Sequence, residues 1–229
     1  MKRALSITLI LLCLLSFAGC SQKESGQSET PETTKAPETT TETVPAKPTE
    51  EPTETAFSRG SWDEEGKIFV NESTGIRIEL SGDYTATADN ELASIYVGRD
   101  EDVSTWTEAE FKTEISIPDC QFVNSKACNT GVMYENLAAE NAVGVSEDQY
   151  ISVVMSQISG SYEGFEQSEI YDLVLSGENY RAVDMKYSTN GVPVGQTLAV
   201  RSVGDYMTII VFSSLQGDSE IETMISFFK

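Results

Sequence analysis

The chain of 229 residues contains no histidine. Without an imidazole it cannot use Ser-His-Asp or Cys-His catalysis, and it lacks the most common zinc and copper ligand. Positive charge is also scarce, because 15 Lys and Arg residues stand against 37 Asp and Glu, a net charge of −22. Such an acidic chain is repelled by phosphate backbones and by anionic headgroups. A nucleic-acid partner or a basic membrane-binding patch is therefore not expected.

Long apolar runs are absent except at the N-terminus. Lys2 and Arg3 precede a run of about 14 mostly apolar residues, from Ala4 to Phe17. This run is shorter than the roughly 20 residues that a transmembrane helix needs. Its length is typical of the apolar region of a secretory signal peptide, so residues 1–19 are predicted to be a signal peptide.

The end of this leader is the tetrapeptide Phe17-Ala18-Gly19-Cys20. It resembles the lipobox of bacterial lipoproteins, in which an apolar residue and two small residues precede an invariant cysteine. The resemblance implies that the Cys20 thiol carries a diacylglyceryl group and that the peptidase cuts just before it. Phe17 replaces the usual leucine but keeps the apolar character. The alternatives are an ordinary secretory signal with an incidental cysteine, or a short membrane anchor.

Residues 20–56 have a composition unlike the rest of the chain. After Cys20 they contain ten Thr, eight Glu, five of the seven Pro and a single large apolar residue, Val44. Such a segment cannot bury enough apolar surface to offset the entropy of ordering, so a disordered stalk is predicted. Its expected role is to hold residues 57–229 away from the membrane, on the extracytoplasmic face.

Residues 57–229 are predicted to form one α+β domain. Strands are expected at 67–71, 75–80, 118–124, 128–137, 169–175, 179–189, 192–203 and 206–213, and helices at 89–97, from 107, at 147–158 and from 219. Capping boxes at Thr107, Ser146 and Ser219 mark three of the helix starts, and Asn190-Gly191 marks a two-residue hairpin turn. This grouping favours an antiparallel sheet of about six to eight strands covered by helices.

The order of these elements resembles the PsbP/Mog-like fold, which also occurs in lipid-anchored bacterial proteins. The resemblance depends on the opening Arg59-Gly60-Ser61-Trp62, the hairpin at 69–80, the middle helix and the closing strands from Tyr180 to 210. The Arg-Gly-x-Trp opening after a Thr/Glu/Pro stalk is also similar to small lipoproteins of Gram-positive gut anaerobes. The resemblance implies a binding or assembly factor without shared catalytic residues.

Only two cysteines, Cys120 and Cys128, lie in the predicted domain. A hairpin centred near Asn124 would place them opposite each other, so a cross-strand disulfide is predicted in an oxidising exterior. Two buried thiols and a redox pair are the alternatives.

The remaining candidates for chemistry are acidic. Asp100, Asp102 and Ser104 fit part of a calcium loop, but Thr105 and Phe111 occupy its two most demanding positions, so no metal site is predicted. No cofactor motif is present, and Trp62 and Trp106 are expected in the core. We therefore predict a non-catalytic, membrane-anchored binding or assembly module with a protein or glycan partner at the cell envelope. The alternatives are a carboxylate-dependent hydrolase of wall or glycan material and cation-dependent adhesion.

Overall fold

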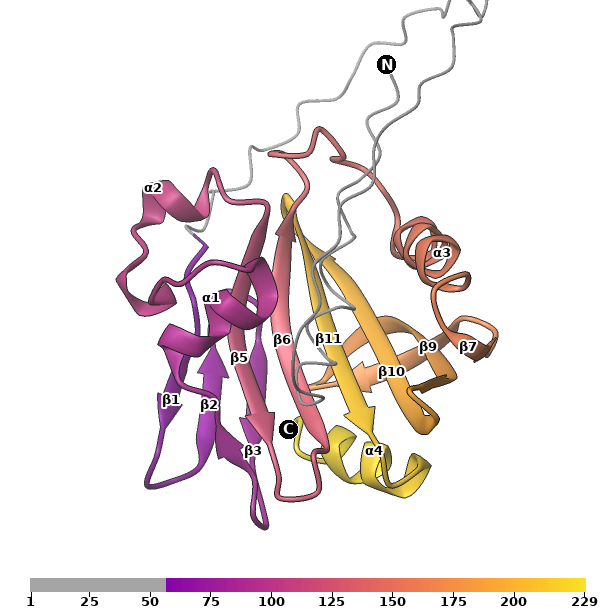
Figure 1. Cartoon of the computed structure of the whole chain (residues 1–229). Helices are drawn as coiled ribbons and strands as arrows, with labels where there is room; N and C mark the ends of the chain where they lie inside the picture. Colours follow the sequence, from indigo (N-terminus) through magenta and orange to yellow (C-terminus); the bar gives the residue numbers. More distant parts are fainter. Residues whose placement is uncertain (1–56) are drawn as a thin grey trace, which may run out of the picture.

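The computed structural model describes residues 57–229 (Figure 1). The predicted signal peptide, the lipobox Phe17-Ala18-Gly19-Cys20 and the stalk lie outside the described residues. The strands are β1 (Ser61–Asp63), β2 (Ile68–Asn71), β3 (Ile76–Glu79), β4 (Thr85–Ala86), β5 (Ser116–Val123), β6 (Asn129–Asn136), β7 (Glu163–Gln167), β8 (Tyr171–Leu175), β9 (Glu178–Thr189), β10 (Val192–Val203) and β11 (Tyr206–Ser214). The helices are α1 (Asp89–Val97), α2 (Glu108–Phe111), α3 (Glu147–Ile158), α4 (Asp218–Ile225) and a short 3₁₀ turn, η3 (Val103–Thr105).

Eight strands form the main antiparallel sheet, in the order β4-β5-β6-β11-β10-β9-β7, with β8 also paired to β9. A long hairpin joins β9 to β10 through Asn190 and Gly191. Both residues have positive φ angles, of 51° and 76°, as the predicted two-residue turn requires. The predicted α+β architecture with an antiparallel sheet is confirmed.

The two faces of the main sheet are covered differently. Helices α1 and α3 pack on one face, at its two sides (Figure 1). The opposite face packs against a separate three-stranded sheet, β1-β2-β3, and against α4. The sequence predicts helices as the only cover, so this small sheet is an unpredicted second layer.

Helix α1 lies close to the main sheet because one strand residue has no side chain. A Cβ at Gly131, on β6, would be 1.9 Å from the hydroxyl oxygen of Tyr96 on α1. Tyr96 itself is 2% exposed and packs in the core of this face. Glycine at position 131 therefore makes room for the aromatic ring that fixes α1 on the sheet.

The helix starts follow the predicted caps in two of three cases. The Ser146 side chain accepts from the Gln149 N–H while Gln149 reaches back, the capping box predicted for α3. Thr107 and Glu110 cap α2 in the same reciprocal way. The cap predicted at Ser219 is wrong, because α4 begins one residue earlier and follows Gly217, which has no side chain to cap it.

Candidate functional site

Residues 57–60, which we call the entry segment, lead into β1 of the small sheet. Arg59 binds this segment to the edge of the main sheet. Its Nη2 donates to the carbonyl oxygen of Asp119 and to Oδ1 of Asp89, both at 2.7 Å, and its Nε donates to the carbonyl oxygen of Pro118. Strand β4 pairs only with Phe122 and Val123, so the edge of β5 near Pro118 has no neighbouring strand. Arg59 occupies that edge and replaces the missing strand as the donor.

Asp119 is the centre of the buried polar contacts beneath Arg59. Its carboxylate accepts from the Gly60 N–H at 2.8 Å, from Asn71 Nδ2 at 2.8 Å and from the Tyr134 hydroxyl at 2.7 Å. We call Arg59, Gly60, Asn71, Asp119 and Tyr134 the Asp119 cluster. It joins the entry segment, the small sheet and two strands of the main sheet through one carboxylate.

Two local features of the chain place Asp119 there. The pairing of β5 with β6 shifts between Pro118 and Cys120, a bulge that leaves Asp119 as the extra residue and turns its side chain inward. A Cβ at Gly60 would be 2.2 Å from the Phe69 ring, so only glycine lets the backbone come close enough to donate to Asp119.

Burial raises the pKa of the Asp119 carboxyl above its ordinary value of 3.8. The hydrogen bonds from Tyr134, Asn71 and the Gly60 N–H, together with the charge of Arg59, oppose that increase. Burial also raises the pKa of Tyr134, and the neighbouring Asp119 adds to the effect. These shifts fit a carboxylate that accepts from fixed protein donors.

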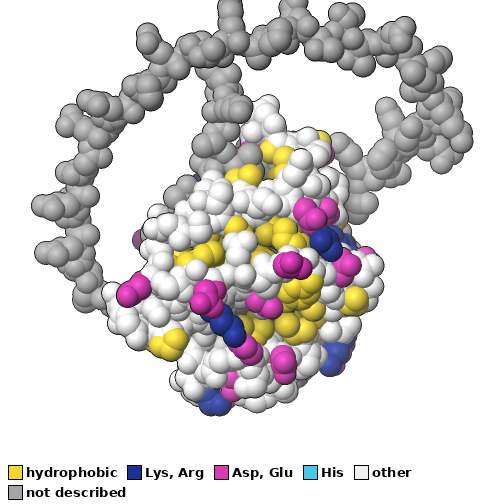
Figure 2. Space-filling model, turned by 90° about the vertical axis from the view of Figure 1, so that its right-hand side faces the viewer, with side chains coloured by type: hydrophobic (Ala, Val, Ile, Leu, Met, Phe, Trp, Pro, Cys, Tyr) yellow, Lys and Arg dark blue, Asp and Glu magenta, His cyan; other side chains and the backbone are white. Residues whose placement is uncertain are grey.

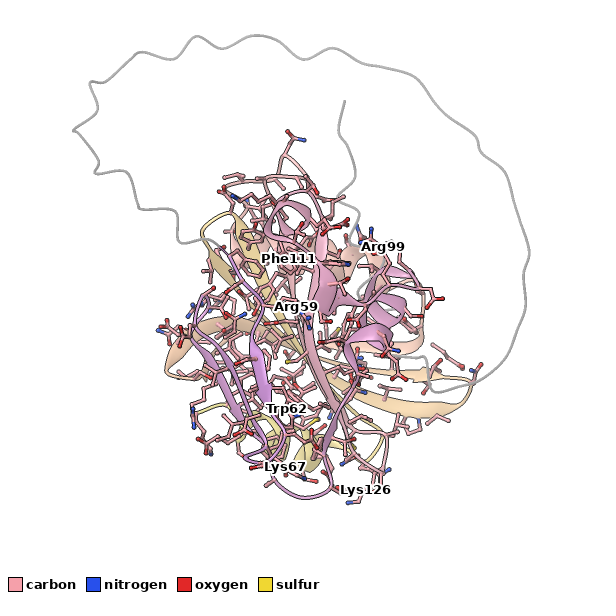
Figure 3. All side chains as sticks on the ribbon, turned by 90° about the vertical axis from the view of Figure 1, so that its left-hand side faces the viewer. Arg59, Trp62, Lys67, Arg99, Phe111 and Lys126 are labelled. Carbon is pink, nitrogen blue, oxygen red and sulfur yellow. The ribbon has the colours of Figure 1, made fainter. Side chains whose placement is uncertain are left out.

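A cavity of about 380 Å³ opens beside the Asp119 cluster, and we call it the Trp62 cavity. The entry segment, the junction of β4 with α1, and β5 form its walls. Figure 3 shows Arg59, just before β1, and Trp62, on β1; both line the cavity. The polar and aromatic residues that line it are Arg59, Trp62, Glu64, Phe69, Thr87, Asp89, Asp119, Gln121 and Phe122. Its size is within the range of about 300–1,000 Å³ typical of ligand pockets.

The predicted disulfide is not formed, because the predicted register of its hairpin is wrong. Cys120 and Cys128 are both free and buried. Cys120 pairs with Val132, so about 13 Å of strand separates it from Cys128, where a disulfide needs Cα atoms within about 7 Å. Burial raises the pKa of the Cys120 thiol well above its ordinary value, which disfavours the reactive thiolate. The alternative of two buried thiols is the observed one.

The other side chains singled out from the sequence lie in two places. Trp62 is half-buried and packs on Phe122 at a ring distance of 5.1 Å, where it also lines the cavity. Trp106 packs against the apolar cores on the two faces of the main sheet. The guanidinium group of Arg99 lies over its ring, 5.0 Å from the centroid. Asp102 accepts from the Ser104 N–H and so caps η3, as expected for an acidic loop before a helix.

No group of three or more His, Cys, Asp or Glu side chains is placed to hold a metal ion within residues 57–229. Within the same part of the chain, no helix combines the length and the apolar character that crossing a membrane takes.

A second buried carboxylate, on β6, lies under the other face of the sheet. Glu135 is 1% exposed and accepts a hydrogen bond from the Tyr150 hydroxyl on α3. Burial raises the pKa of Glu135 to about 7, and the nearby Glu140 adds to the increase. The hydrogen bond between Tyr150 and Glu135 links α3 to the middle of the sheet. The pKa of the Glu135 carboxyl is higher than that of most carboxyl groups.

We expect the Glu135 titration to make the protein less stable as pH rises. The folded-state pKa of about 7 exceeds the ordinary 4.5, so the folded state binds the proton more tightly and stability falls between pH 5 and 8. The size of the effect is roughly 2–3 kcal/mol. Urea unfolding at both pH values should show this loss in the wild type and a smaller loss in Glu135→Gln.

The absence of histidine makes this measurement clean, because no imidazole titrates in that range. Any contribution from Asp119 is common to both proteins and drops out of the comparison. An identical pH dependence in wild type and Glu135→Gln would contradict the assignment to Glu135.

The fold and the cavity together describe a small α+β domain with a polar, aromatic-lined pocket at its entry segment.

No protein-family model matches the chain, and no curated protein sequence matches it either. Among solved structures, the PsbP protein (CyanoP) of Synechocystis sp. PCC 6803 is 10% identical, with a TM-score of 0.41 over 77% of this chain and 94% of that one. LpqN, involved in cell envelope biogenesis of Mycobacterium tuberculosis, is 12% identical, with a TM-score of 0.37 over 66% and 76%.

A protein of unknown function from Pseudomonas aeruginosa, PA94, a putative regulator by its description, is 12% identical, with a TM-score of 0.30 over 42% and 65%. At such TM-scores and identities these likenesses carry no argument about the family or the role of this chain. Membership of the PsbP/Mog-like family stays a prediction.

Proposed function

We propose that the chain is a lipid-anchored, extracytoplasmic binding module whose ligand site is the Trp62 cavity. The observation that carries the proposal is the cavity itself, where polar groups from three separate segments converge beside a half-buried tryptophan. Convergent polar groups in a partly apolar pocket are the usual form of a small-ligand site. The leader and the lipobox-like Cys20 support the place of action.

The charge of the described residues supports the need for a lipid anchor. Residues 57–229 carry 29 acidic and 10 basic residues. Figure 2 shows acidic side chains spread around a band of hydrophobic ones on one face of the molecule. Such a surface is repelled by anionic headgroups, so stable attachment calls for inserted acyl chains.

The contacts of the carboxylates in the cavity favour binding over catalysis. Asp89 pairs with Arg59, and Glu64 accepts from Trp62 Nε1 at 2.6 Å. Asp119 is held by its three donors, as described above. A carboxylate-dependent hydrolase, the alternative that the sequence leaves open, would use these same groups, but each already accepts from a protein donor.

Protease treatment of spheroplasts tests the proposed location. With the cytoplasmic membrane intact, we expect added protease to degrade the wild-type protein while a cytoplasmic marker survives. A variant that lacks residues 2–19 supplies the control, because it should stay inside and be protected. Wild-type protein that is protected as well as this control would contradict an extracytoplasmic location.

A further inference from the structure

We draw no further inference here: the strongest candidate, the face of the main sheet between α1 and α3, where the side-chain oxygens of Asn129 and Gln196 are buried and accept from none of the described residues, carries nothing because nothing in the structure shows what covers this face.

Discussion

Replacing Asp119 with alanine is expected to lower the free energy of unfolding by about 3–5 kcal/mol. The carboxylate accepts from Gly60, Asn71 and Tyr134 and lies 3.8 Å from the Arg59 Nε. Its removal leaves the Gly60 N–H without its acceptor and takes one acceptor each from Asn71 and Tyr134. It also leaves Arg59 without one of its two carboxylate partners. Urea unfolding at neutral pH measures the loss.

Asp172→Ala is the matched control, because it also removes one carboxylate that pairs with an arginine. The side chain of Asp172 is 75% exposed, and its pair with Arg181 lies in solvent. We expect a loss below about 1 kcal/mol there. Similar losses in the two variants would show that the Asp119 cluster contributes no more than a surface ion pair.

Replacing Cys20 with alanine is expected to abolish lipid attachment and to remove the protein from its place on the membrane. Two acyl chains give stable attachment, and no basic patch is available to replace them in so acidic a chain. Residues 57–229 have two apolar cores of their own, so we expect their fold to be unchanged. Metabolic labelling with an alkyne fatty acid, followed by membrane fractionation, measures both effects.

Cys13→Ala serves as the control for this experiment, since Cys13 lies in the predicted leader and should be lost with it. This variant should keep the label and the membrane location. Lipid label on the Cys20→Ala protein would contradict the lipobox assignment. A variant that is unlabelled but still bound to the membrane would point to the uncut leader or to a partner as the anchor.

Elements with strong local signals were predictable from the sequence. Helix α3 has its predicted bounds, because the Ser146 cap and the spacing of Ile151, Val154 and Ile158 are contained in one stretch of chain. The β9–β10 hairpin follows from Asn190-Gly191 for the same reason. Strands β1, β4 and β7 were missed, since they are short and pair with partners that local patterns do not reveal.

The register of β5 and β6 failed because its turn has no glycine signal. The loop after Asn124 is held by the Asn124 side chain, whose oxygen accepts from the N–H groups of Lys126 and Cys128. Ala127 has a φ of 59°, a left-handed conformation in which glycine or asparagine is more usual. The turn is therefore centred two residues beyond Asn124, which moves Cys120 away from Cys128.

The candidate site was only partly visible in the sequence. The Arg59-Gly60-Ser61-Trp62 opening is a recognisable pattern, but its contacts with Asp119 cross about 60 residues of chain. A usable signal was an aspartate in the middle of the buried strand around Ile117 and Phe122, because a buried carboxylate requires partners. Nothing local identifies Arg59 and Asn71 as those partners.

The position of Arg59 has a mechanical consequence for a tethered protein. If Cys20 carries the proposed anchor, drag on the domain pulls along the chain through Phe57 and Ser58 to Arg59. The first hydrogen bonds along this path join Ser58 to Ser73 and Asn71 of the small sheet and its turn. Those from Arg59 to Pro118 and Asp119 come next. Part of the force therefore reaches β5 of the main sheet through Arg59, and part reaches the small sheet through Ser58. Arg59, which lines the cavity, would then spread the load of an anchored chain over both sheets.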